Sequence, residues 1–400
     1  MKVFSIFKKN KLFVLLSSLL IAMMCMAMFT QASSNLDIMF DYDFSLNTFR
    51  GVTLGIICLA VISVFYFRPK KCQNNIKSSL LYFTILVTIS IFFNSDDFAN
   101  GSFSALRYSI LHLLLFLCYY KFAYNIEDKC FYLLLIIILI AFSITYYQIH
   151  EIVFLQLSTS SIWVSAYVVI LLPLVLLIPN KVLRTICIAI IIVVVLTNTK
   201  RTALIATFLA LFLYYIINTN VKNRSLLNTI IVFALLFIVA NFVFDYFDTI
   251  SDNALSGRFK DMDQSDGVEG RIDIYKKIIS LIGDFDFVAL LVGKGYDSVA
   301  KYIDYSAHND ILEVLFDYGI VGLILYLRLH YSIIMQTVRL WNNKSPYTAS
   351  LASSYVIFLI FTLFSHVIIY MTFSLFAIGW GYIIGKEDIR LQCNRFNNTK

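Results

Sequence analysis

The 400-residue chain has little charge and little proline. Asp, Glu, Lys and Arg together make up 14 % of it, and only four residues are proline. A soluble domain of this length needs more polar residues than that to cover its surface. Hydrophobic residues instead make up 60 %, mean hydropathy is +0.79, and many apolar runs approach the ~20 residues that cross a bilayer core. The composition predicts an all-α polytopic membrane protein.

Cysteine is sparse where the chain is most polar. None of the seven cysteines falls between Phe244 and His308, so neither a disulfide framework nor a cysteine metal site is expected there. Lysines 8, 9 and 11 precede a long apolar run that ends in no clear cleavage site, which predicts an uncleaved first helix. The net charge of +7 is spread over short loops, so it gives no nucleic-acid signal.

Hydropathy predicts about twelve spans. Their expected limits are 11–30, 51–67, 79–93, 103–124, 131–149, 161–178, 183–199, 202–218, 226–245, 310–327, 349–365 and 369–385.

Lysine and arginine in the short loops predict the orientation, because they favour the cytoplasmic side. Both termini are expected in the cytoplasm, and the polar segment that ends at His308 is expected outside. The chain then divides into spans 1–9 (1–245), an outer loop (246–308), spans 10–12 (309–385) and a cytoplasmic tail (386–400). Within the outer loop, amphipathic spacing predicts a helix over 267–283, and a second is expected over 295–306.

Several cations lie where hydropathy disfavours them. An arginine at the centre of a membrane costs about 2.5–3.5 kcal/mol on insertion scales, so it is expected to face a partner or a wet cavity. Snorkelling to the outer headgroups is the alternative for Arg107 and Lys200, and a solvated helix face is the alternative for Arg271. Arg201, in the short turn between two middle spans, is the stronger functional candidate.

His308 ends the outer loop and directly precedes a predicted span. Most lone histidines are structural, but an imidazole at such a boundary suits proton abstraction near neutral pH. Asn309 follows it, and Glu313 lies one turn into the span. Gly319 and Gly322 form a small-residue notch on that span, which favours close approach of another helix or a lipid chain.

Three stretches together resemble one family. The first is His308-Asn309, followed after nine residues by Gly319 and Gly322. The second is "TKRTALIA" (199–206), a turn between two predicted spans. The third is "EGRIDIYKKI" (269–278), which lies in the predicted outer loop. In order and spacing they resemble the superfamily of O-antigen polymerases and O-antigen ligases, with Lys200 where serine is more usual and Tyr275 in the aromatic position.

The resemblance implies a GT-C-like glycosyltransferase of the bacterial inner membrane. It acts at the periplasmic face on a glycan carried by undecaprenyl pyrophosphate, and no cofactor is implied. His308, with Asn309 beside it, would serve as general base for the acceptor hydroxyl. The substrate would be bound by Arg201, Arg271, Arg107, Lys200, Tyr275 and Glu313.

Polymerase is the favoured activity, with a second carrier-linked repeat unit as acceptor; the alternative is a ligase that transfers the glycan to the lipid A core. Membrane lipid surrounds the chain, and a chain-length regulator and a flippase are the expected protein partners. A polysaccharide flippase or transporter is the alternative of another class, although paired halves with broken helices are expected there.

Asp-x-Asp pairs at 41–43, 261–263 and 284–286 offer a competing metal site for Mg²⁺ or Mn²⁺. Such pairs also arise by chance in polar loops, and no metal is expected.

Overall fold

A computed structural model describes residues 11–33, 42–67, 74–93, 102–156, 164–197, 201–221, 268–303, 306–365, 367–368 and 371–398. Over these residues the regular elements are all α-helices, as the composition predicts. They are α2 (Lys11–Ser33), α3 (Tyr42–Tyr66), α4 (Asn75–Phe93), α5 (Ser102–Asn125), α6 (Asp128–Gln156), α7 (Ser165–Val175), α8 (Lys181–Thr197), α9 (Arg201–Val221), α12 (Val268–Gly283), α13 (Phe287–Val292), α14 (Ser298–Ile303), α15 (Asp310–Asn342), α16 (Thr348–Phe364) and α17 (Phe373–Asn398).

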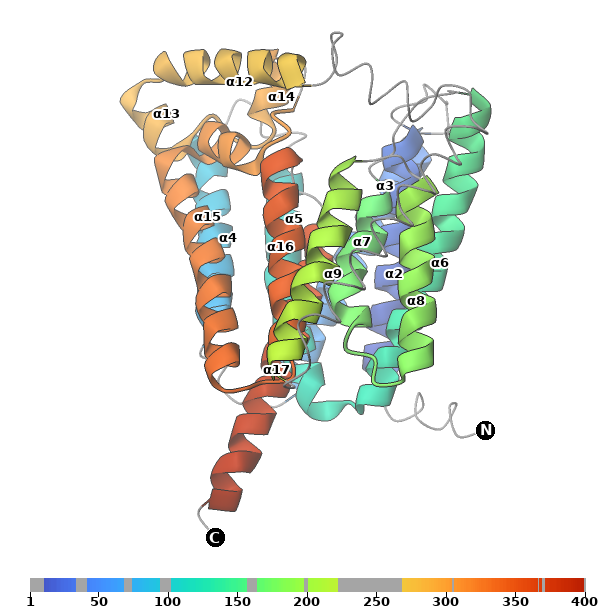
Figure 1. Cartoon of the computed structure of the whole chain (residues 1–400). Coiled ribbons are helices and arrows are strands. Elements are labelled where there is room, and N and C mark those ends of the chain that lie inside the picture. Colours follow the sequence, from blue (N-terminus) through green and yellow to red (C-terminus); the bar gives the residue numbers. More distant parts are fainter. Residues whose placement is uncertain are drawn as a thin grey trace.

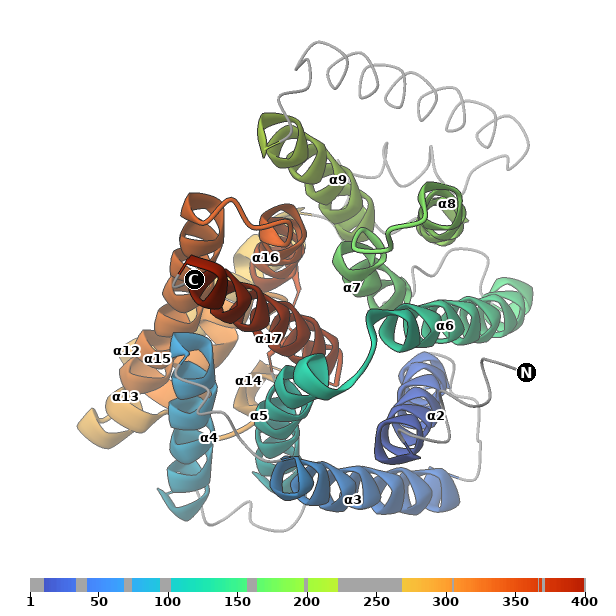
Figure 2. The same cartoon turned by 90° about the horizontal axis from the view of Figure 1, so that it is seen from below.

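The long helices run side by side as a bundle, and α12, α13 and α14 lie across one end of it (Figure 1). We call this the outer end. The last helix, α17, projects beyond its neighbours at the opposite end of the bundle (Figure 1). Viewed from that opposite end, α5 and α17 lie near the middle, with the other long helices arranged around them (Figure 2).

Two of the described helices are long and apolar enough to cross a membrane by length and composition, over Lys11–Phe29 and Asp128–His150. Five more are apolar but shorter, and they include Thr202–Asn218 and Thr348–Phe364. Continuous backbone hydrogen bonding along such helices is what a hydrocarbon environment requires. The apolar helices therefore indicate a membrane protein.

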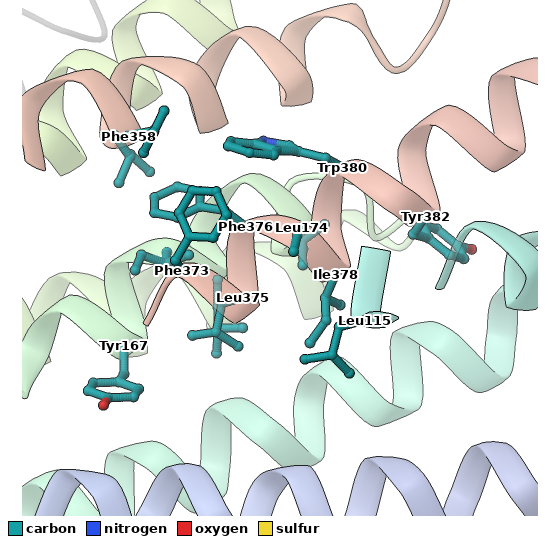
Figure 3. Packing of buried hydrophobic residues seen from close by; sticks show 14 of the residues in the cluster. Leu115, Tyr167, Leu174, Phe358, Phe373, Leu375, Phe376, Ile378, Trp380 and Tyr382 are labelled. Atoms are coloured by element: carbon teal, nitrogen blue, oxygen red, sulfur yellow. The ribbon is translucent and has the colours of Figure 1, made fainter. Parts of the chain in front are cut away.

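The core is rich in aromatic side chains where α16 and α17 meet. Phe358, Phe373, Phe376 and Trp380 pack together near Leu174 and are buried (Figure 3). The Trp380 indole also donates a hydrogen bond of 3.0 Å to Ser354 Oγ. That bond satisfies the one polar atom of a side chain that otherwise contributes only apolar area.

Glycines allow α17 to approach α5 closely. A Cβ added at Gly381 would collide with the carbonyl oxygen of Phe116, and one at Gly385 would lie 2.6 Å from both the Ala123 Cβ and the Tyr120 carbonyl oxygen. The two glycines are four residues apart and so share one face of the helix. Small residues at this spacing bring the two helix backbones together, as is typical of packing within membranes.

The two largest differences from the predicted helix limits lie at the end opposite the outer end. α15 continues past residue 327 to Asn342, and α17 past residue 385 to Asn398. Hydropathy windows stop where charges begin, whereas a helix needs only its own backbone bonds to continue. The predicted span 226–245 lies outside the described residues.

In the outer loop, the helix predicted over 267–283 is present as α12. The one predicted over 295–306 is shorter, and six-residue α13 was not anticipated, because so short a helix leaves no readable periodicity.

Candidate active site

His308 lies at the outer end, where the outer loop enters α15. Asn309 caps that helix: its side-chain oxygen accepts hydrogen bonds from the backbone N–H groups of Ile311 and Leu312, at 2.9 and 3.2 Å. Its amide nitrogen donates to the carbonyl oxygen of Leu363, at the end of α16, at 3.2 Å. Asn309 therefore fixes the residue before it against two helices at once.

The loop that carries His308 is also held from within α15. The Glu313 carboxylate is 1 % exposed and accepts a hydrogen bond of 2.8 Å from the backbone N–H of Ala307. His308 itself is half-exposed with φ of 51°, a left-handed conformation that costs most residues other than glycine about 1–3 kcal/mol. Such a strained conformation persists only where the surrounding contacts impose it. The hydrogen bonds of Ala307 and Asn309, on either side of His308, are among these contacts.

Asp310, the first residue of α15, ties this segment to the bundle. Its buried carboxylate accepts hydrogen bonds from the Tyr326 hydroxyl at 2.7 Å and from the Val367 backbone N–H at 2.8 Å. The Tyr326 hydroxyl also lies 2.8 Å from Thr362 Oγ1. In a straight helix Asp310 and Tyr326 would be about 24 Å apart, so α15 must bend sharply between them.

The bend occurs at Gly319, which has φ of 65° and ψ of −165° inside α15. A Cβ there would collide with the backbone of Leu291 in α13, and one at Gly293 (φ 77°) would collide with the backbone of Asp317. Two glycines thus let the backbones of α13 and α15 touch. Each position requires glycine for two reasons: its φ is positive, and no space is left for a Cβ.

Backbone bonds join the two segments at this contact. The carbonyl oxygens of Phe316 and Asp317, just before the kink, accept hydrogen bonds from the N–H groups of Lys294 and Gly295, at 3.0 and 2.9 Å. The buried Asp317 carboxylate accepts two more, from the N–H groups that begin α14: Asp297 at 2.8 Å and Ser298 at 3.0 Å. A carboxylate suits the positive end of a helix dipole.

Gly322, the other half of the predicted notch, is buried below the kink. A Cβ there would collide with the Tyr318 Cβ on the other side of the kink, and it would lie 3.5 Å from the Leu86 side chain of α4. The two glycines therefore have different roles: Gly319 makes room for the backbone of α13, and Gly322 makes room for Tyr318 of the same helix.

Arg271 and Tyr275 belong to α12 and are half-buried. Both lie on the same side of the helix as Ile278, because separations of seven and three residues bring side chains to one face. Ile278 is fully buried in the apolar cluster that joins α12 to α14 and to the outer part of α15. Arg271 is therefore on the side of α12 that faces the bundle and not on the opposite, more exposed side.

Arg107 lies on α5 close to the level of the kink. Two residues further on, the Ser109 carbonyl oxygen accepts a hydrogen bond of 3.2 Å from Thr84 of α4. The neighbouring Phe83 packs edge-on against Tyr318, with ring centroids 5.6 Å apart. Arg107 is half-buried and lies two residues nearer the outer end than Ser109. It is therefore close below the level of the outer helices.

Arg201 is the first residue of α9 and lies near the level of the α16 end that holds Asn309. Ser353 of α16 donates a hydrogen bond to the Ala210 carbonyl oxygen of α9. The two helices run in opposite directions at this contact. Arg201 precedes Ala210 by nine residues in α9, and Thr362 follows Ser353 by nine residues in α16, so both lie about 13 Å nearer the outer end. The Arg201 side chain and Lys200 lie outside what the structure describes.

Among the described residues, no group of three or more His, Cys, Asp or Glu side chains is placed to hold a metal ion. Of the Asp-x-Asp pairs, only Asp284 and Asp286 have described side chains. Asp286 caps α13 by accepting a hydrogen bond of 2.7 Å from the Ala289 N–H. Asp41 and the pair at 261–263 lie outside the described residues, as does the side chain of Asp43.

Sequence reasoning missed the roles of two buried carboxylates, those of Asp310 and Asp317. The signal was present, because acidic residues repeat at positions 310, 313 and 317 on an otherwise apolar helix, and buried carboxylates need partners. Their partners are backbone N–H groups of other segments and, for Asp310, also the Tyr326 hydroxyl sixteen residues along the same helix. No sequence pattern marks these contacts.

The comparison with known families agrees with this part of the chain. Residues 185–327 match the family described as O-antigen ligase. The match runs from α8 to just beyond the kink in α15, and it includes every site residue predicted from the sequence except Arg107. No curated protein matches the chain. The expected resemblance to the O-antigen polymerase and ligase superfamily is confirmed over these residues, and the match does not separate polymerase from ligase.

Proposed function

We propose that the chain is a membrane glycosyltransferase that polymerises surface-polysaccharide repeat units at the outer end of the bundle. Both substrates are glycans linked to undecaprenyl pyrophosphate, and the outer end faces the periplasm across the inner membrane. The observation that carries the proposal is the fixed position of His308, held by Asn309 and Glu313 at the end of the bundle where α12 presents Arg271.

The reaction needs a base and a stabilised leaving group. The acceptor hydroxyl oxygen attacks the anomeric carbon of the donor sugar, and its proton passes to the His308 imidazole. The bond between that carbon and the phosphate oxygen breaks, the pyrophosphate leaves on its lipid carrier, and the anomeric configuration inverts. General-base assistance is typically worth about 10²–10⁴-fold.

Arginine suits the leaving group, because its planar fork binds phosphate oxygens and keeps its charge at any physiological pH. Arg271 and Arg201 bind the pyrophosphate in this proposal, with Arg107 and Lys200 as secondary cations. They also stabilise the charge that grows on the leaving oxygen in the transition state. Tyr275, on the bundle side of α12, contacts the sugars of the donor.

The ligase alternative uses the same residues with the lipid A core as acceptor, and the family match favours it equally. One experiment separates the two. His308→Ala is expressed in cells that lack the native gene, and surface glycans are displayed on a gel. Loss of the ladder above one repeat, with single-repeat caps retained, supports the polymerase. Loss of every capped species supports the ligase.

The matched control is His150→Ala, because His150 is a half-buried histidine of α6 outside the outer loop. It is expected to leave the ladder unchanged. An unchanged ladder in the His308 variant, with the protein at its normal level, would overturn the role of His308 as the base in either glycosyltransferase reaction.

A further inference from the structure

Helix α13 exposes two apolar side chains at its start. Phe287 is 74 % exposed and Val288 is 52 % exposed, whereas Ala289 is buried against the rest of the protein. An aromatic ring largely exposed to water is unfavourable, and here a second apolar side chain, that of Val288, follows it directly in the helix.

The position of α13 indicates what surrounds this edge. Figure 2 shows α13 beyond α4 and α15, at the periphery of the bundle, and Figure 1 shows it above the long part of α15. The position of α13 along the bundle axis is fixed, because the Leu291 backbone lies against Gly319 at the kink of α15. Immediately below the kink α15 begins to expose apolar side chains on its outer surface, among them Ile320 and Ile324 (59 % exposed).

The residues around α13 have the composition of a membrane–water boundary. The Lys294 ammonium lies 5.3 Å from the ring centroid of Phe285, and aromatic rings and lysines concentrate at the headgroup level of bilayers. Asp284 and Asp286 are exposed beside the apolar edge, which limits its entry to the headgroup region.

We propose that Phe287 and Val288 insert into the leaflet at the outer end of the bundle, so that α13 anchors the outer helices to the lipid surface. The edge is continuous with the lipid-facing surface of α15. Two side chains are also too few for a stable protein–protein interface, which needs about 800 Å² from each partner. The anchor is independent of the reaction proposed above and of which compartment the outer end faces.

Tryptophan fluorescence tests the proposal on the full chain in nanodiscs. Phe287→Trp is compared with Ser280→Trp, which places the same reporter on the exposed side of α12, opposite buried Ile278. The signal of the three native tryptophans is subtracted using the unsubstituted chain. Lipids brominated near the top of the acyl chain quench membrane-inserted indole, and aqueous iodide quenches indole in water.

The expected result is that bromolipid quenches the tryptophan at position 287 about twofold or more beyond the one at 280, since interfacial helices bury their apolar face by about 5–10 Å. Iodide is expected to show the reverse order. Equal iodide quenching at both positions, without bromolipid quenching at 287, would overturn the anchor. Protection of position 287 from both quenchers, together with a dimer in light scattering, would also overturn it, in favour of a second copy of the chain.

Discussion

The Tyr326 hydroxyl lies 2.7 Å from a carboxylate oxygen of Asp310, although sixteen positions separate the two residues along α15. The kink at Gly319 makes this contact possible, and the contact in turn holds the two arms of the helix together. Because Asp310 is two residues after His308, the bond sets where the proposed base stands relative to the bundle.

Tyr326→Phe removes this donor and leaves a buried carboxylate with one hydrogen bond fewer. We expect the protein to lose about 1–3 kcal/mol of stability, the usual cost of depriving a buried polar group of its partner. Thermal unfolding in detergent measures the loss. Tyr331→Phe, at an exposed position of the same helix, is the control and should unfold with the unsubstituted chain. Coincident curves for all three proteins would show that the bond contributes nothing.

Gly319→Ala adds a Cβ where the Leu291 backbone lies and where φ is positive. We expect α13 to separate from α15, with a cost of about 1–3 kcal/mol from the backbone conformation alone. Amide hydrogen exchange over 287–295 should become faster. Gly283→Ala is the matched control, because nothing lies within 4 Å of a Cβ at that glycine. Unchanged exchange in the Gly319 variant would contradict the tight contact described here.

Asp317→Asn keeps the size of the side chain but removes its charge and one of its two acceptor oxygens. Because both oxygens accept N–H groups at the start of α14, we expect the first turn of that helix to open more often. Faster exchange confined to 297–303 would report it. Asp273→Asn, in an exposed pair with Lys276, should leave the pattern unaltered, and a similar change in both variants would refute a specific role for Asp317.

His308→Gly separates the backbone role of this residue from the chemical one. Glycine adopts φ of 51° without strain, so the loop should keep its shape while the base is lost. We expect transfer to fall by about 10²–10⁴-fold and to recover in part when imidazole is added to the assay. Activity that survives in the glycine variant without imidazole would remove His308 from the chemistry.

Arg271→Lys retains the charge but loses the planar fork, whereas Arg271→Ala loses both. If the guanidinium binds pyrophosphate, transfer should fall in the order arginine, lysine, alanine, with a steeper loss of kcat/KM for alanine. Lys276→Ala removes a cation from an exposed position of the same helix and should have little effect. Equal rates for the lysine and alanine variants would indicate that the charge of Arg271 is not used.

The sequence predicted much of the helical content but not the way α15 is built. Apolar runs revealed most of the described long helices because each run carries its own signal. Gly319 was expected to make room for a neighbour, yet its positive φ and the resulting fold-back of Asp310 onto Tyr326 depend on contacts with α13 and α16. The spacing of His308, Asn309 and the two glycines pointed to the family that residues 185–327 match, whereas the roles of the buried carboxylates emerged only in three dimensions.

The close packing of α17 against α5 has a consequence for the synthesis of the protein. Phe116 is made early, and the Gly381 that packs against its carbonyl oxygen comes more than half the chain later. At a synthesis rate of about 5–20 residues per second, α5 waits roughly ten to fifty seconds in the membrane for its main neighbour. During that interval the face of α5 that later receives the glycines is left to lipid or to the insertion machinery, so a chain cut short before α17 would leave this face uncovered.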